Sequence, residues 1–190
     1  DLGASFTDVP GGTASWSFEG GTNYQDENGS VEIVIGKAAT ITVVTINGGP
    51  FTYTGFAQTP ATVSVTGANL SLTPTANYTN NVNAGTATAS YTYVESANHF
   101  GSSDSKNFTI GKAVLTATAD DQTKVYGAAN PSLTFQYSGW VNGMETIDTP
   151  PSINTTAENC SNVGFYPITL STGLDNNYLF SFNNAQLEIT

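Results

Sequence analysis

Residues 31–38 read VEIVIGKA, and residues 106–113 read KNFTIGKA. In each copy, an alternating apolar and polar run ends in the tetrapeptide IGKA, and the two copies stand 75 positions apart. The chain has 190 residues and only four basic ones, so half of its positive charges lie in the same short motif. A motif that returns at a long, fixed spacing indicates an internal repeat, and internal repeats decide the architecture of a chain.

The similarity extends well beyond the tetrapeptide. With a shift of 75, TASW (13–16) falls on TASY (88–91). With a shift of 79, Asn98 falls on Asn177, and the residues that follow them, histidine and tyrosine, also align. The segments that we predict from these shifts are the C-terminal part of a preceding repeat (1–37), a full repeat (38–112) and a second, more diverged repeat (113–190).

The IGKA motif therefore marks the junction between repeats. We expect Lys37 and Lys112 to be solvated charges beside a flexible glycine, in junctions too short to allow much movement. Residues 1–37 are too few to bury an apolar face alone. They are expected to dock on the neighbouring repeat, to pair with another chain or to mark a truncation, and any export signal is expected upstream or already removed.

The composition excludes several classes of partner. The formal net charge is −11 and the sequence pI is about 4.1. Nucleic acids and anionic membranes are bound through clustered Lys and Arg, so neither is an expected partner. No apolar run reaches the roughly 18 residues that a membrane span needs, so no direct membrane insertion is expected. The single cysteine rules out an intrachain disulfide.

Short alternating runs indicate strands throughout the chain. In TATASYTY (86–93), Ala87, Ala89 and Tyr91 share one face, and Ser90 lies on the other. Asn-Gly and Asn-Pro pairs separate these runs, as expected of turns. Several short strands in each 75–79 residues predict an all-β chain of tandem small immunoglobulin-like β-sandwich modules.

The third segment resembles a known family. Its sequence TKVYGAANPSLTFQYSGWVNGMET (123–146), followed by NVGFYPITLSTGLDNNYLFSFNNAQLEIT (162–190), is similar to the MBG ("mostly beta, glycine-rich") repeats of large bacterial surface proteins. Residues 38–112 resemble, more weakly, other immunoglobulin-like bacterial surface repeats. The resemblance implies tandem modules in secreted or cell-envelope proteins of the adhesin type, and it implies no catalytic residues.

The residues that carry most enzyme chemistry are scarce. His99 is the only histidine, and it stands where the other repeats have Tyr24 and Tyr178. A position filled by tyrosine and histidine is expected to pack or to anchor a turn. Cys160 has no histidine nearby to activate it as a nucleophile. We therefore expect no enzymatic activity.

Two kinds of binding residue remain. Asp120, Asp121 and Asp175 lie in oxygen-rich loops of the type that hold Ca²⁺ weakly in extracellular modules, and the alternative is that they are solvated turn residues. Trp140 follows Gly139 beside the Asn142-Gly143 turn, where it would either stack a ligand or cap the end of the sandwich.

These observations favour a non-enzymatic extracellular repeat module that acts as a stalk or spacer in a bacterial cell-surface, adhesin-like protein. Its expected partners are the neighbouring repeats of the same chain. The alternative is a module that binds carbohydrate or a host or cell-surface protein through its loop aromatics and acidic loops.

Overall fold

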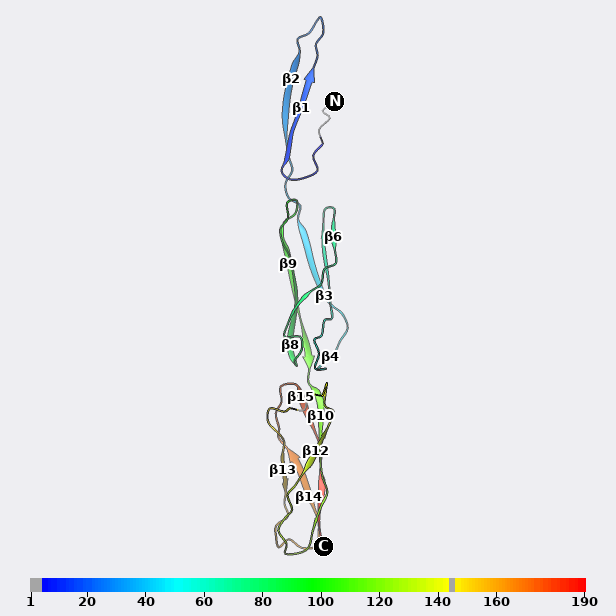
Figure 1. The fold of residues 1–190 in the computed structure, drawn as a ribbon, viewed down its shortest axis with the longest axis vertical. Coiled ribbons are helices and arrows are strands. Elements are labelled where there is room, and N and C mark those ends of the chain that lie inside the picture. Colours follow the sequence, from blue (N-terminus) through cyan, green and yellow to red (C-terminus); the bar gives the residue numbers. More distant parts are fainter. Residues whose placement is uncertain (1–4, 144–145) are drawn as a thin grey trace. The chain divides into compact units, whose positions relative to one another are not determined.

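The computed structural model describes residues 5–143 and 146–190, and these form strands, turns and loops (Figure 1). No helix occurs among the described residues, and so none that is long and apolar enough to cross a membrane. The predicted all-β fold is confirmed. The strands in chain order are β1 (Gly11–Phe18), β2 (Glu27–Val34), β3 (Thr40–Ile46), β4 (Phe51–Thr52), β5 (Ala61–Gly67), β6 (Leu70–Leu72), β7 (Asn77–Thr79), β8 (Gly85–Tyr93), β9 (Ser102–Gly111), β10 (Ala113–Ala119), β11 (Gln122–Lys124), β12 (Phe135–Ser138), β13 (Ser152–Thr155), β14 (Gly164–Ser171), β15 (Tyr178–Asn183) and β16 (Ala185–Ile189).

The alternation in the sequence becomes the two faces of each strand. In β10 the odd-numbered residues from Ala113 to Ala119 are buried, whereas Val114 between them is exposed. Successive side chains of a strand point to opposite faces, so period-two burial means that one face packs on a core. The same alternation buries Ala87 and Ala89 in β8.

The chain divides into two compact units. The first comprises residues Asp1–Asn47, Ala61–Asn77 and Ala89–Lys106. It contains the antiparallel hairpin β1–β2 and the antiparallel sheet with the order β3-β5-β6. Its buried residues include Val44 of β3 and Val65 of β5.

A side chain completes the hydrogen bonding of β3 in this unit. The Asp104 carboxylate accepts the Val44 N–H at 2.8 Å and also the Ser105 N–H at 2.8 Å. The bond from Val44 is the main cause that holds the pKa of Asp104 below its ordinary value, with Ser105 and Lys106 adding to it.

The second unit comprises Gly48–Pro60, Tyr78–Thr88 and Asn107–Thr190. Its C-terminal part is built from two sheets, ordered β12-β10-β15 and β11-β16-β14-β13. Strand β10 pairs antiparallel with β12 and parallel with β15. The sheets share one core, as in a β-sandwich; its buried members are Ala117, Ala119, Ala157, Ile168, Leu170, Leu187 and Ile189.

A further sheet has the order β4-β9-β8-β7. Within the second unit its apolar residues include Phe108 of β9, which packs edge-on against Phe51 at 5.3 Å and against Tyr78 at 6.4 Å between ring centroids. The predicted segment boundaries at residues 37–38 and 112–113 remain predictions, as does the tandem arrangement of repeats.

Replacing Leu115 by alanine tests the sandwich core. Leu115 has 0 % exposure in the central strand β10, so Leu115→Ala leaves a cavity and should lower the free energy of unfolding by about 2–5 kcal/mol. Urea denaturation followed by circular dichroism measures the change. The matched control is Val114→Ala on the outer face, where the side chain is 58 % exposed and the expected loss is under about 1 kcal/mol. Equal losses in the two variants would contradict the assigned faces of β10.

Candidate functional site

Trp140 lies in the loop after β12, directly after Gly139, whose φ of 98° is a backbone conformation that glycine accommodates. The indole is half-buried. It packs edge-on against Tyr137 at 5.2 Å and against Tyr178 at 5.6 Å between ring centroids. Trp140 therefore packs on two aromatic rings, and its role as a cap or as a ligand platform stays a prediction.

The exposed part of Trp140 lines an open groove of about 550 Å³, whose other lining residues are Gln136, Tyr137, Ile147 and Pro150. The Tyr137 hydroxyl is buried and finds no hydrogen-bond partner among the described residues. Burial raises the pKa of Tyr137 above its ordinary value. The groove thus offers the aromatic side chains of Trp140 and Tyr137 and the side-chain amide of Gln136.

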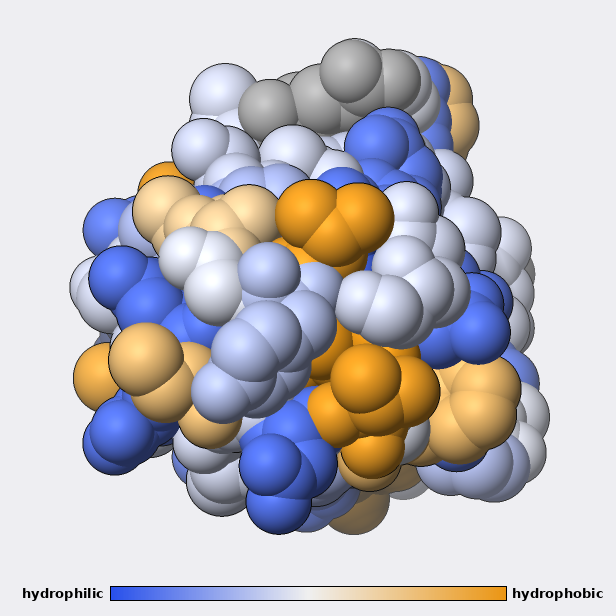
Figure 2. Space-filling model, turned by 90° about the horizontal axis from the view of Figure 1, so that it is seen from below, coloured by the Kyte–Doolittle hydropathy of each residue, from blue (hydrophilic) through white to orange (hydrophobic). Residues whose placement is uncertain are grey.

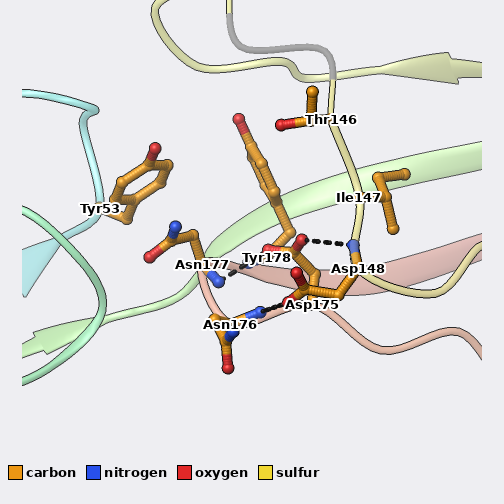
Figure 3. Close-up of a pocket in the computed structure, with 8 residues that line it drawn as sticks. All are labelled: Tyr53, Thr146, Ile147, Asp148, Asp175, Asn176, Asn177 and Tyr178. Atoms are coloured by element: carbon orange, nitrogen blue, oxygen red, sulfur yellow. Dashed lines mark hydrogen bonds between the residues drawn. The ribbon is translucent and has the colours of Figure 1, made fainter.

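A smaller pocket of about 160 Å³ is lined by Tyr178 and by the two loops that carry Asp148 and Asp175 (Figure 3). The Asp175 carboxylate accepts the Asp148 N–H at 3.2 Å, and the Asp148 carboxylate accepts the Asn176 N–H at 3.0 Å. Asp175 also accepts the N–H groups of Asn177 at 2.7 Å and Tyr178 at 2.8 Å. These carboxylates connect the two loops by accepting hydrogen bonds from main-chain amides.

Tyr53 also lines this pocket. It is almost fully buried and packs edge-on against Tyr178 at 5.6 Å between ring centroids. Burial is the main cause of the raised pKa of Tyr53, and the neighbouring Tyr178 and Asp175 contribute to it.

The three predicted Ca²⁺ ligands do not share one loop cluster. Asp120 accepts the Thr134 hydroxyl at 2.7 Å, Asp121 accepts the Gln186 N–H at 2.8 Å, and Asp175 pairs with Asp148. Among residues 5–143 and 146–190 there is no group of three or more His, Cys, Asp or Glu side chains that could hold a metal. Sequence analysis missed Asp148, because no motif or regular sequence spacing relates it to Asp175 and only the folded structure brings the two together. Binding of Ca²⁺ remains a prediction.

Neither His99 nor Cys160 lines one of these pockets. The His99 Nε2 is 2.8 Å from the Ala68 carbonyl oxygen, and Tyr178, which aligns with His99 under the shift of 79, accepts the Val141 N–H at 3.0 Å with its hydroxyl. Both rings therefore anchor main chain, as expected for this position. The Cys160 thiol is free and exposed.

The two junction lysines form matching hydrogen bonds. Lys37 donates to the Ser96 carbonyl at 2.8 Å, and Lys112 donates to the Asp175 carbonyl at 2.6 Å. Ser96 and Asp175 occupy the same place in their segments. Lys112 is exposed and Lys37 is partly exposed, and each ammonium group also donates to a main-chain carbonyl, which the sequence did not indicate.

An asparagine forms further hydrogen bonds near each of the two lysines. The Asn98 side-chain oxygen accepts the Val9 N–H at 2.9 Å, and the Asn177 side-chain oxygen accepts the Ala84 N–H at 2.9 Å. The main-chain carbonyls of the same asparagines accept the N–H of Ala38 and of Ala113, each at 2.9 Å. We call this set of bonds, formed once around Asn98 and once around Asn177, the joint.

The side-chain amides of Asn98 and Asn177 donate to a further pair of equivalent residues. Asn98 donates to the Asp8 carboxylate at 2.6 Å, and Asn177 donates to the Asn83 side-chain oxygen at 3.4 Å. Residues 8–9 and 83–84 are equivalent under the shift of 75. The same four kinds of hydrogen bond thus occur at equivalent positions in both joints.

Lys124 is a polar residue of the core that sequence analysis did not single out. It is buried, and its ammonium group donates to the carbonyls of Glu158 at 2.8 Å and Ala128 at 3.1 Å. Asn130 donates to the neighbouring Ala157 carbonyl at 2.6 Å. These bonds hold the loops at that end of the sandwich, while the Asn130 side-chain oxygen is buried without a hydrogen-bond partner among the described residues.

Residues 115–188 match the family model described as MBG domain (YGX type). The resemblance stated for the third segment is confirmed, and this part of the chain is an MBG domain. Such a domain indicates a repeat module of a bacterial surface protein. No curated protein and no solved structure matches the chain.

Removing the Asp175 carboxylate tests its role in pinning the loops. Asp175→Ala leaves three main-chain N–H groups without their acceptor and should lower the free energy of unfolding by about 1–3 kcal/mol. Asn176→Ala, at the exposed neighbouring position, is the control and should change it by less than about 0.5 kcal/mol. Thermal unfolding of both variants measures the difference, and an Asp175 variant as stable as the control would show that these bonds do not hold the loops.

Proposed function

We propose that this chain is a non-enzymatic, extracellular repeat module that acts as a stalk or spacer in a bacterial cell-surface, adhesin-like protein. The observation that carries the proposal is the joint, which occurs twice with the same bonds, together with the MBG domain at residues 115–188. A spacer needs successive modules to be held at fixed joints, since free linkers would let the modules move independently.

The chemistry of the joint suits this role. Each joint uses a lysine and an asparagine, whose bonds go largely to main-chain groups. Main-chain N–H and C=O groups are present whatever side chains the facing repeat carries. Joints of this kind therefore tolerate sequence divergence between repeats, which the 38–112 and 113–190 segments display.

The same side chains argue against an enzyme. His99 is engaged with a main-chain carbonyl, and the exposed Cys160 lies in a loop without a histidine near it in sequence. The proposed partners are neighbouring repeats of the same chain. The net charge of −11 argues against nucleic acid as a partner.

Adding a module tests the spacer proposal. The added segment is a second copy of residues 112–190 placed directly after Thr190, which occupies the place of Gly111 in the repeat. We call this protein the extended chain. Small-angle X-ray scattering should give a larger maximum dimension for the extended chain than for the 190-residue chain, because each spacer module adds length. An unchanged maximum dimension would refute the spacer role.

A second candidate function is binding of carbohydrate or a host protein at the groove beside Trp140. The observation that favours it is the half-exposed indole, held edge-on by Tyr137 and Tyr178 so that part of its face lines the groove. Aromatic faces of this kind provide large contact area at binding sites.

Titration against a panel of glycans and matrix proteins, first with Ca²⁺ and then with EDTA, tests this second function. Saturable binding that Trp140→Ala weakens about tenfold or more would establish the groove as its site. Phe165→Ala, which removes an exposed aromatic ring from β14, is the matched control and should leave binding unchanged. Binding that survives Trp140→Ala would exclude this groove, and loss of binding in EDTA would support a Ca²⁺ site.

A further inference from the structure

The joint has two sides. One side is the loop that carries the asparagine, together with the lysine that donates to a carbonyl of that loop. The other side is the pair of residues at 8–9 or 83–84, which we call the socket. The shift of 79 that aligns Asn98 with Asn177 also aligns the socket at Asn83-Ala84 with Asn162-Val163. The alignment therefore predicts a third socket at Asn162-Val163, within the MBG domain.

The backbone at Asn162-Val163 has the geometry of a socket. Gly85 directly follows the second socket with a φ of 136°, and Gly164 directly follows Val163 with a φ of 146°. This region favours glycine, so the same unusual conformation sets the direction of the chain at both places. Strand β14 begins at Gly164, just as β8 begins at Gly85.

Tyr126 is the structural counterpart of Tyr53. The Tyr53 N–H donates to the Gly111 carbonyl at 2.8 Å, and the Tyr126 N–H donates to the Thr190 carbonyl at 2.9 Å. Gly111 and Thr190 are equivalent positions. At the joint around Asn177, Tyr53 is 4 % exposed and packs against Tyr178, whereas Tyr126 is 58 % exposed.

The surface around the third socket is apolar and open. Val163 is 67 % exposed and Val125, next to Tyr126, is 62 % exposed. Figure 2 views the molecule from the side on which the C terminus lies in Figure 1, and apolar side chains gather near the middle of that view among polar ones. At the Asn177 joint the equivalent tyrosine is buried, so the exposed ring of Tyr126 marks the site where a contact of the same kind fits.

We propose that Asn162 and Val163 form a third socket, and that this socket and the neighbouring ring of Tyr126 bind a further module carrying the Gly-Lys-Ala junction and an asparagine-aromatic loop like Asn177-Tyr178. This inference rests on the proposed repeat-module function and names the surface and the partner that it requires. The partner module is joined after Thr190, because in both joints the lysine follows the last strand of the module that carries the socket. A second free copy of the chain would bring another net charge of −11 and is repelled.

The extended chain tests this socket through hydrogen exchange. In it, the added Asn177 should accept the Val163 N–H, as the original Asn177 accepts the Ala84 N–H. The Val163 amide should then exchange about tenfold more slowly than in the 190-residue chain, measured by nuclear magnetic resonance. The Ala84 amide is the internal reference, because its joint is present in both proteins.

Substitutions confined to the added copy complete the test. Asn177→Ala there should return Val163 exchange to its rate in the 190-residue chain, whereas Asn176→Ala should keep it slow. A Val163 amide that exchanges equally fast in both chains while Ala84 stays protected would overturn the third socket. An added module that stays unfolded would overturn it too, because the original copy of the same sequence is folded on its joint. A protected Val163 with an unchanged scattering dimension would instead refute the spacer role alone.

Discussion

The Asn177 side chain is the contact around which the second unit is organised. Its oxygen accepts the Ala84 N–H, its amide reaches Asn83, and its main-chain carbonyl accepts the Ala113 N–H. One residue thus binds Asn83 and Ala84 through its side chain and Ala113 through its main chain. Modules of this size bury only a modest core, so polar contacts at their ends add order that packing alone does not supply.

Asp175 links the joint to the loops of the sandwich. Its carboxylate accepts three main-chain N–H groups, and its carbonyl accepts the Lys112 ammonium. The loop therefore has one arrangement in which both the side chain and the main chain of Asp175 are satisfied. Lys124 plays a comparable part at the opposite end of the same strands, where it fills a site lined by two carbonyls. Satisfied networks of this kind favour a single conformation, because any other arrangement leaves buried polar groups without partners.

The two candidate roles place different demands on the same unit. In the joint, a lysine and an asparagine bond largely to main-chain groups, so the side chains of the residues they contact matter little. The groove beside Trp140 depends instead on particular aromatic rings. Tyr178 lies next to both, since it follows Asn177 in the chain and its ring packs edge-on against Trp140 and against Tyr53. The geometry therefore couples the joint to the groove through a single ring.

Much of the fold could be predicted from the sequence, because its signals are local or periodic. Alternating residues predicted strands such as β8 and β10, whereas the junctions that the two IGKA motifs suggest remain predictions. The motifs around Tyr126-Gly127 identified the MBG domain, and the substitution of His99 for tyrosine indicated an anchoring position rather than a catalytic one. Only the tertiary structure decided that Lys37 and Lys112 are bound, that Asp148 meets Asp175, and that Lys124 is buried between carbonyls. These pairings join residues that are far apart in the chain, often through main-chain groups that every sequence possesses, and so no pattern of side chains could specify them before the strands were brought together.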